Sequence, residues 1–419
     1  MIQKTSIGRC IETLHVVNLS VVGGVESLFC DFIESGGLGD GFTQHVVSGT
    51  SVHDEFSGRL KDTAETLVCL KKARFGVYLP RRPRWLREHR ARALARRVSP
   101  MVIAAWNNPG RREAVLMKRE SPGASLVYLE HGASWDSDPV KTRAFLQECD
   151  RVVCNSYAAK RVIEERFGVV ADNVVRVPLR PRVLADVGIS HAKCVQRHRP
   201  FQLGIAGRHV PLKGYTVVLH ALKALIDGGY DAELQVAGTG PELPRFLKLA
   251  TSLGLARRVH ARGHVSHMGG FFRDIDILLV PSVREPFGLV SVEAAAHGCI
   301  VVAAAVDGLP ETMSEGCSGI LVPPTEPLTS LQELGGTCER IPDRVYDPVS
   351  DSLRIPKVLD PGALARAVSG LVDDSSGFQA MSQQAMDYAR SAYRFDAYIE
   401  ALGDEIRALR GASSPLMMD

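Results

Sequence analysis

Two glutamates lie on either side of a predicted helix start in this 419-residue sequence. Glu285 lies in a loop after an apolar run at residues 275–280 that predicts a buried strand, and seven residues separate it from Glu293. The alanines around Glu293 favour a helix and Gly298 ends it, so residues 289–297 are predicted to be helical. Unpaired N–H groups at a helix start attract phosphate, and carboxylates accept hydrogen bonds from hydroxyls. We therefore expect this stretch to hold a ligand with both groups, such as a nucleotide-sugar. The N–H groups are those of Phe287, Gly288 and Leu289.

Two cations follow another predicted strand, at residues 201–206. They are Arg208, which comes after Gly207, and Lys213, which precedes Gly214 and a predicted helix. Arginine can bind phosphate oxygens in bidentate fashion, and lysine adds a point charge. The alternative is a pair of exposed surface cations. The flanking glycines favour a phosphate site.

The N-terminal half offers two more candidates at strand ends. Residues 12–19 predict a strand that runs into Gly23 and Gly24 and then a helix, and two glycines at such a turn let the backbone approach a ligand. Ser27 stands where the dinucleotide-binding fingerprint requires a third glycine, so that motif is not present. His131 follows another predicted strand, where ligands bind in open sheets, and we expect it to contact a ligand rather than to be purely structural.

Strands alternate with helical stretches along the chain, which predicts the α/β class with doubly wound parallel sheets. The length suits two domains, and the proline-containing, aperiodic residues 178–199 predict a linker. We expect Rossmann-like domains at residues 1–195 and 196–392, followed by a helix and a tail at residues 393–419. The predicted strands are at residues 12–19, 45–47, 101–105, 126–129, 151–154, 201–206, 233–237, 259–265, 275–280, 300–304 and 319–323.

Residues 325–359 interrupt this alternation. They contain four prolines and lie between a predicted strand at 319–323 and a predicted helix at 361–372. A segment of this length inside a compact domain is usually functional or mobile. A specificity flap and a partner-binding insertion are both consistent with the sequence.

Composition and charge exclude several classes of protein. The net charge is +3, and no apolar run approaches the roughly 18 residues of a membrane span. Nine dispersed cysteines without a Cys-x-x-Cys pair suggest reduced thiols in a cytosol. Residues 71–97 hold eleven Lys or Arg and one acid, Glu88. Arginines between apolar residues suit an anionic membrane surface, and a solvated charged face is the alternative. No nucleic-acid partner is expected, because aromatic platforms and known motifs are missing.

The glutamate stretch resembles the motif of two glutamates separated by seven residues in retaining GT-B glycosyltransferases. The family is the large, glycosyltransferase family 4-like group that includes lipopolysaccharide-core and mannosyl transferases. Pro-Phe-Gly within the stretch, Pro-Ser before it and Gly-Leu-Pro-Glu311 after it support the resemblance. The segment from Gly207 to Gly214 resembles the family's element for the donor diphosphate. The resemblance implies two domains that face across a cleft and a last helix that returns to the first domain.

The same resemblance implies roles for the candidate residues. Arg208 and Lys213 would hold the donor diphosphate, Glu293 the ribose hydroxyls and Glu285 the hydroxyls of the donor sugar. The remaining contacts would come from His131 at the donor sugar or phosphate, Gly23 and Gly24 near the donor phosphate or the acceptor, and the backbone near Val265 at the base.

Two positions depart from the family pattern. Ile300 stands where a proline is common, and Asp307 stands where a glycine is common. Neither change removes a functional side chain. Asp307 can alter the backbone near the donor.

These features predict an enzyme, a retaining glycosyltransferase of the hexosyltransferase type that uses a nucleoside-diphosphate sugar and needs neither metal nor other cofactor. Its catalytic residues would be His131, Arg208, Lys213 and Glu285. The expected acceptor is a lipid-linked or phosphorylated saccharide, with lipopolysaccharide core first and other cell-surface polysaccharides next. The expected location is cytoplasmic, peripheral on the inner face of the membrane.

Three alternatives bear on this prediction. Asp136 and Asp138 form an Asp-x-Asp pair, which binds metal in the other main transferase fold, GT-A, but here it is interpreted as a surface loop. A nucleotide-sugar epimerase of the same fold is disfavoured by Arg208 and Lys213. A catalytically silent sugar-nucleotide-binding module is disfavoured because all the charged candidates are present.

Overall fold

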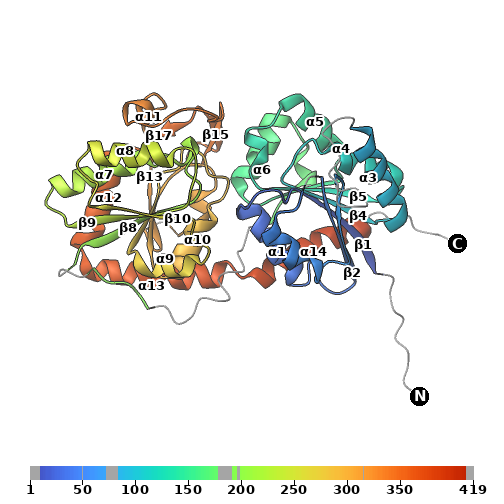
Figure 1. The fold of residues 1–419 in the computed structure, drawn as a ribbon, viewed down its shortest axis with the longest axis horizontal. Coiled ribbons are helices and arrows are strands. Elements are labelled where there is room, and N and C mark those ends of the chain that lie inside the picture. Colours follow the sequence, from blue (N-terminus) through green and yellow to red (C-terminus); the bar gives the residue numbers. More distant parts are fainter. Residues whose placement is uncertain are drawn as a thin grey trace, which may run out of the picture. The chain divides into compact units, whose positions relative to one another are not determined.

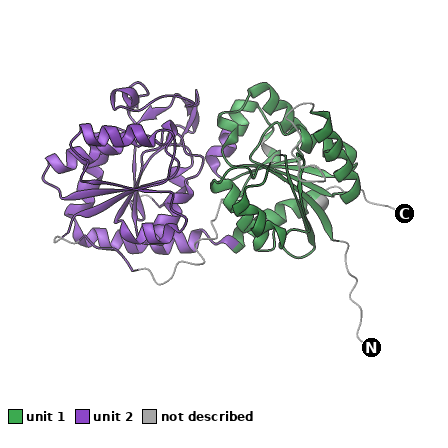
Figure 2. Cartoon of the chain, in the orientation of Figure 1, with its two compact units in different colours: residues 1–155, 163–178, 396–419 green, residues 156–162, 179–395 purple. Residues whose placement is uncertain are grey.

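The computed structural model describes residues 10–49, 51–71, 84–177, 191–195, 199–314 and 316–411. The chain divides into two compact units (Figure 2). Unit 1 contains Met1–Asn155, Ile163–Pro178 and Asp396–Asp419, and unit 2 contains Ser156–Val162 and Leu179–Phe395. Most of the predicted linker, residues 178–190 and 196–198, lies outside the described residues.

Unit 1 is built on a seven-stranded sheet in which every neighbouring pair is parallel. Its order is β3-β2-β1-β4-β5-β6-β7, so the strand order reverses between β1 and β4. Strands such as β4, with the sequence Val-Ile-Ala-Ala-Trp, are fully buried, as expected for a parallel sheet covered on both faces. The strands are β1 (Ile11–Val17), β2 (Phe42–Ser48), β3 (Thr66–Cys69), β4 (Val102–Trp106), β5 (Ser125–Glu130), β6 (Arg151–Cys154) and β7 (Val174–Arg176).

Helices lie on both faces of this sheet (Figure 1). The last helix, α14, belongs to unit 1, where Arg407 lies over the ring of Phe42 at 5.5 Å and Glu405 pairs with Arg151 at 3.7 Å. Asp138 caps α5 by accepting hydrogen bonds from two backbone N–H groups, so half of the Asp-x-Asp pair has a structural role. The helices are α1 (Gly24–Glu34), α2 (Asp54–Lys61), α3 (Trp85–Val98), α4 (Arg112–Glu120), α5 (Pro139–Gln147) and α14 (Phe395–Gly411), and unit 1 also contains the end of α6 (Tyr157–Phe167), whose first residues belong to unit 2.

Unit 2 is built on a six-stranded parallel sheet with the order β10-β9-β8-β11-β12-β13. The strand order reverses between β8 and β11, which is where ligands bind in doubly wound sheets. The strands are β8 (Phe201–Ala206), β9 (Ala232–Ala237), β10 (Val259–Gly263), β11 (Ile277–Val280), β12 (Ile300–Ala304) and β13 (Gly319–Val322). The helices around this sheet are α7 (Thr216–Asp227), α8 (Leu243–Ser252), α9 (Met268–Asp274), α10 (Leu289–Ala296), α12 (Pro361–Asp373) and α13 (Ser375–Ala392).

Residues 325–359 form two small antiparallel pairs and a short helix. Leu331, Tyr346 and Val358 are buried, so the insertion has its own packed side chains. It is therefore an ordered part of unit 2 rather than a loop without secondary structure. Its elements are β14 (Glu326–Pro327), α11 (Ser330–Glu333), β15 (Val345–Asp347), β16 (Ser352–Arg354) and β17 (Lys357–Val358).

The predicted fold class is confirmed, because each unit has a parallel sheet with flanking helices. All the predicted strands are present, with small shifts at their ends. The edge strands β3 and β7 and the antiparallel strands of the insertion were not predicted. Edge and insertion strands are short and only partly buried, so their hydrophobic patterns are weak.

Candidate functional site

Lys213 and Glu285 form an ion pair between the loops that follow β8 and β11. These two strands are neighbours at the point where the strand order reverses. The side chain of Lys213 is 21% exposed and that of Glu285 is 12% exposed, so the pair is only partly open to solvent. The structure therefore brings together two predicted site residues at the sheet edge where doubly wound folds bind ligands.

Close backbone packing holds the two loops together. Val283 donates its N–H to the carbonyl of Leu212 at 2.8 Å. Gly214 has φ +59°, and a Cβ there would lie 2.3 Å from the carbonyl oxygen of Pro281. Only glycine combines this backbone conformation with so close an approach. The glycine after Lys213 thus has a packing role as well as the predicted ligand role.

The loop that carries Glu285 is fixed from a second side by Asp307. One carboxylate oxygen of Asp307 accepts the backbone N–H of Glu285 at 2.9 Å, and the other accepts the N–H of Tyr346 at 2.7 Å. Asp307 also donates its own N–H to the carbonyl of Tyr346 at 3.0 Å. Asp307 is 1% exposed and has φ +46°, the region that favours glycine. It joins the insertion to the Glu285 loop.

The helix α10 begins directly after this loop. Gly288 is its N-cap residue, with φ +102°, and no side chain caps the helix. Phe287 is buried, and Leu289 is the first helical residue, so the N–H groups predicted to bind phosphate stand at a helix start. Glu293 is half-buried within α10. The positive end of the helix lies in the same loop segment as Glu285.

The other predicted residues of unit 2 also follow strand ends. Arg208 is exposed, and among the described residues it makes no ion pair. Gly207 has φ +138°, and a Cβ on the neighbouring Gly238 would lie 1.9 Å from its carbonyl oxygen, so two glycines allow the turns after β8 and β9 to meet. Val265 is half-buried and follows β10.

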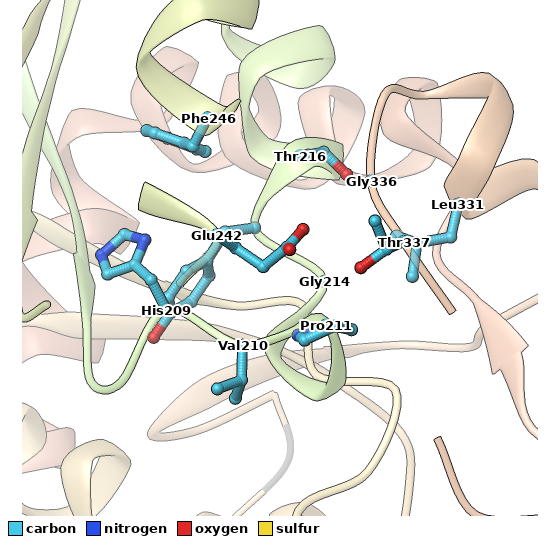
Figure 3. A pocket seen from close by; sticks show the side chains of 11 residues that line it. His209, Val210, Pro211, Gly214, Thr216, Glu242, Phe246, Leu331, Gly336 and Thr337 are labelled. Carbon is cyan, nitrogen blue, oxygen red and sulfur yellow. The ribbon is translucent and has the colours of Figure 1, made fainter. Parts of the chain in front are cut away.

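A small pocket lies beside the Lys213 loop (Figure 3). Residues 209–211 and 214–216 form one side, and the insertion supplies Leu331, Gly336 and Thr337 on the other. Its volume of about 20 Å³ holds roughly one water, so it is too small for a sugar or a phosphate. Glu242 and Thr337 point into it, and the buried hydroxyls of Thr216 and Thr337 have no hydrogen-bond partner among the described residues. A bound water would satisfy these hydroxyls.

His131 lies in unit 1, in the turn after β5. Its ring stacks on Trp106 with the centroids 5.6 Å apart, and Asn107 accepts its backbone N–H at 3.1 Å. Burial lowers the pKa of His131 to about 4, so the imidazole is neutral at pH 7. A neutral imidazole can accept or donate a hydrogen bond to a ligand, and contact with the donor stays a prediction.

Glu130 precedes His131 and was not predicted as a site residue. It is fully buried and accepts hydrogen bonds from the hydroxyls of Tyr128 and Ser134 and from the backbone N–H groups of Gly132 and Ser134. The carboxylate therefore shapes the turn that presents His131. The sequence signal that could have identified Glu130 is a glutamate at the end of an otherwise apolar strand.

The free energy of unfolding of unit 1 is expected to fall between pH 7 and pH 5. Burial holds the pKa of both His131 and His15 at about 4, below the ordinary 6.5. Between these values the unfolded state binds more protons, so stability is lost as pH falls from about 6.5 to about 4, by roughly 1.4 kcal/mol per pH unit for each histidine. All three tryptophans, Trp85, Trp106 and Trp135, belong to unit 1, so their fluorescence in urea reports its unfolding.

His131→Phe keeps an aromatic ring against Trp106 and should remove about half of this pH dependence. An unchanged pH dependence in the variant would contradict the assignment to His131.

The glycine turn after β1 also lies in unit 1. Gly23 is the N-cap residue of α1, and Gly24 is its first residue. A Cβ on Gly23 would lie 2.6 Å from a carboxylate oxygen of Glu26, but that oxygen ends a flexible side chain that can move away, so local packing does not require glycine there. The ligand role of both glycines stays a prediction.

The basic segment is only partly described, because residues 72–83 lie outside the described residues. In α3, Arg87 pairs with Glu113, and both Arg92 and Arg96 pair with Glu120 of α4. These ion pairs give the arginines a role within the unit. Trp85 at the start of α3 is 61% exposed.

The described residues contain neither a metal-ligand cluster nor a membrane-spanning helix. No cluster of three or more His, Cys, Asp or Glu side chains there has the geometry to hold a metal ion. No helix within the described ranges has the length and apolar character needed to cross a bilayer.

Comparisons with solved structures identify the fold as that of GT-B glycosyltransferases. The Anabaena protein HepE in complex with UDP and glucose aligns with a TM-score of 0.71 over 95% of this chain and 100% of its own, at 16% identity. The lipopolysaccharide outer core galactosyltransferase WaaB aligns with a TM-score of 0.68 over 95% of this chain and 99% of its own, at 14% identity. The predicted two-domain architecture is thus confirmed.

Sequence comparison defines the class more closely. Residues 200–335, which include Arg208, Lys213, Glu285 and Glu293, match the family model of group 1 glycosyl transferases. The D-inositol 3-phosphate glycosyltransferase of Geodermatophilus obscurus is 36% identical over 200 residues, which are 43% of this chain and 43% of that protein. The chain thus spans less than half the length of this relative. The predicted resemblance is confirmed, and residues 200–335 are the part of the chain that matches a glycosyl transferase domain.

Proposed function

We propose that the protein is a retaining glycosyltransferase that moves a sugar from a nucleoside-diphosphate sugar to an acceptor hydroxyl. The observation that carries the proposal is the ion pair of Lys213 and Glu285 across the point of strand reversal in unit 2. A cation and a carboxylate held together there match a ligand with a charged diphosphate and a hydroxyl-rich sugar. The matched family model covers both residues.

The chemistry of transfer explains the choice of residues. The bond between the anomeric carbon and the diphosphate oxygen breaks, and the acceptor hydroxyl forms the new bond at that carbon as it loses its proton. Negative charge then accumulates on the departing diphosphate. Lys213, Arg208 and the start of α10 would stabilise this charge, and preorganised groups of this kind supply a large share of enzymatic rate enhancement. Protein cations would serve in place of a metal ion.

Carboxylates would position the donor. Glu285 would accept hydrogen bonds from the sugar hydroxyls, and Glu293 from the ribose. HepE has been crystallised with UDP and with UDP-glucose, which supports a uridine nucleotide as the first donor to test. Backbone near Val265 would contact the base.

The acceptor we propose is a phosphorylated or lipid-linked saccharide or polyol. Relatives in sequence are named for D-inositol 3-phosphate, and proteins of the same fold are named for lipopolysaccharide. A role in lipopolysaccharide core or other cell-surface polysaccharide synthesis, on the cytoplasmic face of the membrane, is part of this proposal. The membrane contact would involve residues 71–97.

The test is release of nucleoside diphosphate from a panel of nucleotide-sugars in the presence of EDTA, with proton NMR of the product to assign the anomeric configuration. Activity with retention supports the proposal. Inversion would refute the retaining mechanism. If no donor is turned over and calorimetry also detects no binding of free nucleoside diphosphates, the proposed donor site is wrong.

A further inference from the structure

Arg111 of unit 1 is a buried arginine that has no carboxylate partner among the residues that the structure describes. Arg111 lies in the loop after β4, and the residue is 8% exposed. Across the described residues it forms no ion pair within 4 Å, and its Nε atom is buried without a hydrogen-bond acceptor. Burying a charge costs free energy unless an opposite charge or hydrogen bonds compensate it. A ligand could supply that missing compensation.

The position of Arg111 is one where doubly wound sheets bind ligands. It reaches from the loop after β4 to Gly49, the residue after β2, and these two strands lie on either side of β1. A Cβ on Gly49 would lie 2.2 Å from Nη1 of Arg111, so glycine leaves the space that the guanidinium occupies. The strand order reverses between β1 and β4. The guanidinium thus lies at the carboxyl edge of the sheet, near the switch point.

Two charged groups of opposite sign lie near Arg111. Arg111 is itself the N-cap residue of α4, and no side chain caps that helix. Glu113 and Arg87 are the charged groups that act on the guanidinium, and they pair with each other at 3.8 Å. Burial lowers the pKa of Arg111 from its ordinary value, which shows that the nearby Glu113 does not offset the desolvation. Arginine nevertheless stays protonated in proteins.

We infer that Arg111 and the start of α4 form a binding site for the phosphate group of the acceptor. This inference rests on the proposed function, because it assigns the acceptor's charge to unit 1 while the donor diphosphate binds in unit 2. A guanidinium binds two phosphate oxygens at once, and the unpaired N–H groups of a helix start can bind a third. The ligand class is a phosphate monoester, either on a small polyol or saccharide or at a lipid headgroup.

The experiment measures unfolding of the full chain in urea by tryptophan fluorescence, with inorganic phosphate or chloride at equal ionic strength. Because all the tryptophans are in unit 1, stabilisation by a ligand of unit 1 appears directly as a higher unfolding midpoint. Arg111→Gln is expected to weaken phosphate binding by about tenfold or more and so to remove the shift. Arg111→Lys keeps the charge without the bidentate geometry and should retain a smaller shift.

Arg119→Gln is the matched control, since Arg119 lies near the other end of the same helix, is 63% exposed and pairs with Glu148. It removes the same charge and should keep the shift. An equal shift in Arg111→Gln and wild type, or an equal loss in both glutamine variants, would overturn the inference. Circular dichroism checks that Arg111→Gln is folded. If it is not folded, Arg111→Lys is used instead. A phosphate-induced shift in Arg111→Lys equal to that of wild type would then contradict bidentate binding by Arg111.

A second experiment distinguishes a lipid phosphate from the phosphate of a small acceptor. Sedimentation with vesicles of phosphatidic acid in phosphatidylcholine, compared with phosphatidylcholine alone, tests a lipid headgroup. Binding that depends on Arg111 in this experiment identifies a lipid, and an effect limited to inorganic phosphate identifies a small acceptor. The donor site is tested separately by calorimetry with nucleoside diphosphates and Lys213→Ala. Failure there would refute the proposed function without affecting the phosphate result in unit 1.

Discussion

Lys213→Ala is expected to reduce release of nucleoside diphosphate by roughly 100-fold or more. In the folded protein Lys213 neutralises Glu285, whose side chain is 12% exposed. Its removal withdraws a cation from the developing charge on the diphosphate and also leaves a carboxylate unpaired beside it. Both changes raise the energy of the transition state more than that of the free enzyme. The measurement is initial rate against donor concentration, with kcat and KM determined separately.

Lys223→Ala is the matched control for this prediction, because Lys223 pairs with Asp227 on the exposed face of α7 in the same unit. It makes the same change in net charge and should leave the rate unchanged. The double variant Lys213→Ala with Glu285→Ala separates two explanations. If Lys213 acts only by pairing with Glu285, the double variant will be no worse than Glu285→Ala. If Lys213 also stabilises the diphosphate, the double variant will remain far below it.

The sequence was sufficient to predict the loops of unit 2 because a doubly wound sheet places consecutive strand ends on one edge. Arg208, Lys213, Glu285 and the start of α10 follow β8 and β11 directly, and their types suit diphosphate and sugar. Glycines marked the same turns, and the structure gives them positive φ values or close backbone contacts. The residue types and the expected strand order were therefore sufficient to predict these loops, although the distances between the residues were not known.

Long-range partners could not be predicted in this way. Lys213 pairs with a residue 72 positions away. The isolation of Arg111 is visible only once the side chains around it are placed. The arginines of α3 suggested a membrane surface from their density, whereas several of them pair with acids of α4. In each case the decisive quantity is which opposite charge lies within 4 Å, and a linear sequence does not contain it.

The insertion and Asp307 are separate features of the sequence, and the structure shows that they are connected. A left-handed position usually favours glycine, because a side chain there costs free energy. Asp307 occupies such a position and uses its carboxylate to join Tyr346 of the insertion to Glu285. The carboxylate's two backbone hydrogen bonds offset the strain.

Asp307→Asn is therefore expected to lower kcat/KM for the donor between roughly 10- and 100-fold, because small displacements of a positioning group have effects of this size. Asparagine keeps the size and tolerates the left-handed backbone. Its NH₂ group, however, would face one of the two backbone N–H groups that now donate to the carboxylate, so one of the two hydrogen bonds would be lost. The free energy of unfolding should fall by about 1–3 kcal/mol. Affinity for free nucleoside diphosphate should change little, since Arg208, Lys213 and the start of α10 remain.

The control for this variant is Asp347→Asn in β15. Asp347 accepts hydrogen bonds from Val349 and Ser350 and pairs with Arg354, all within the same hairpin. If both variants lose activity equally, the integrity of the hairpin matters and the link through Asp307 does not. Asp307→Gly relieves the backbone strain and removes both hydrogen bonds, so it separates strain from positioning. Loss of activity in Asp307→Gly together with full activity in Asp347→Asn would establish that Asp307 positions Glu285 through its side chain.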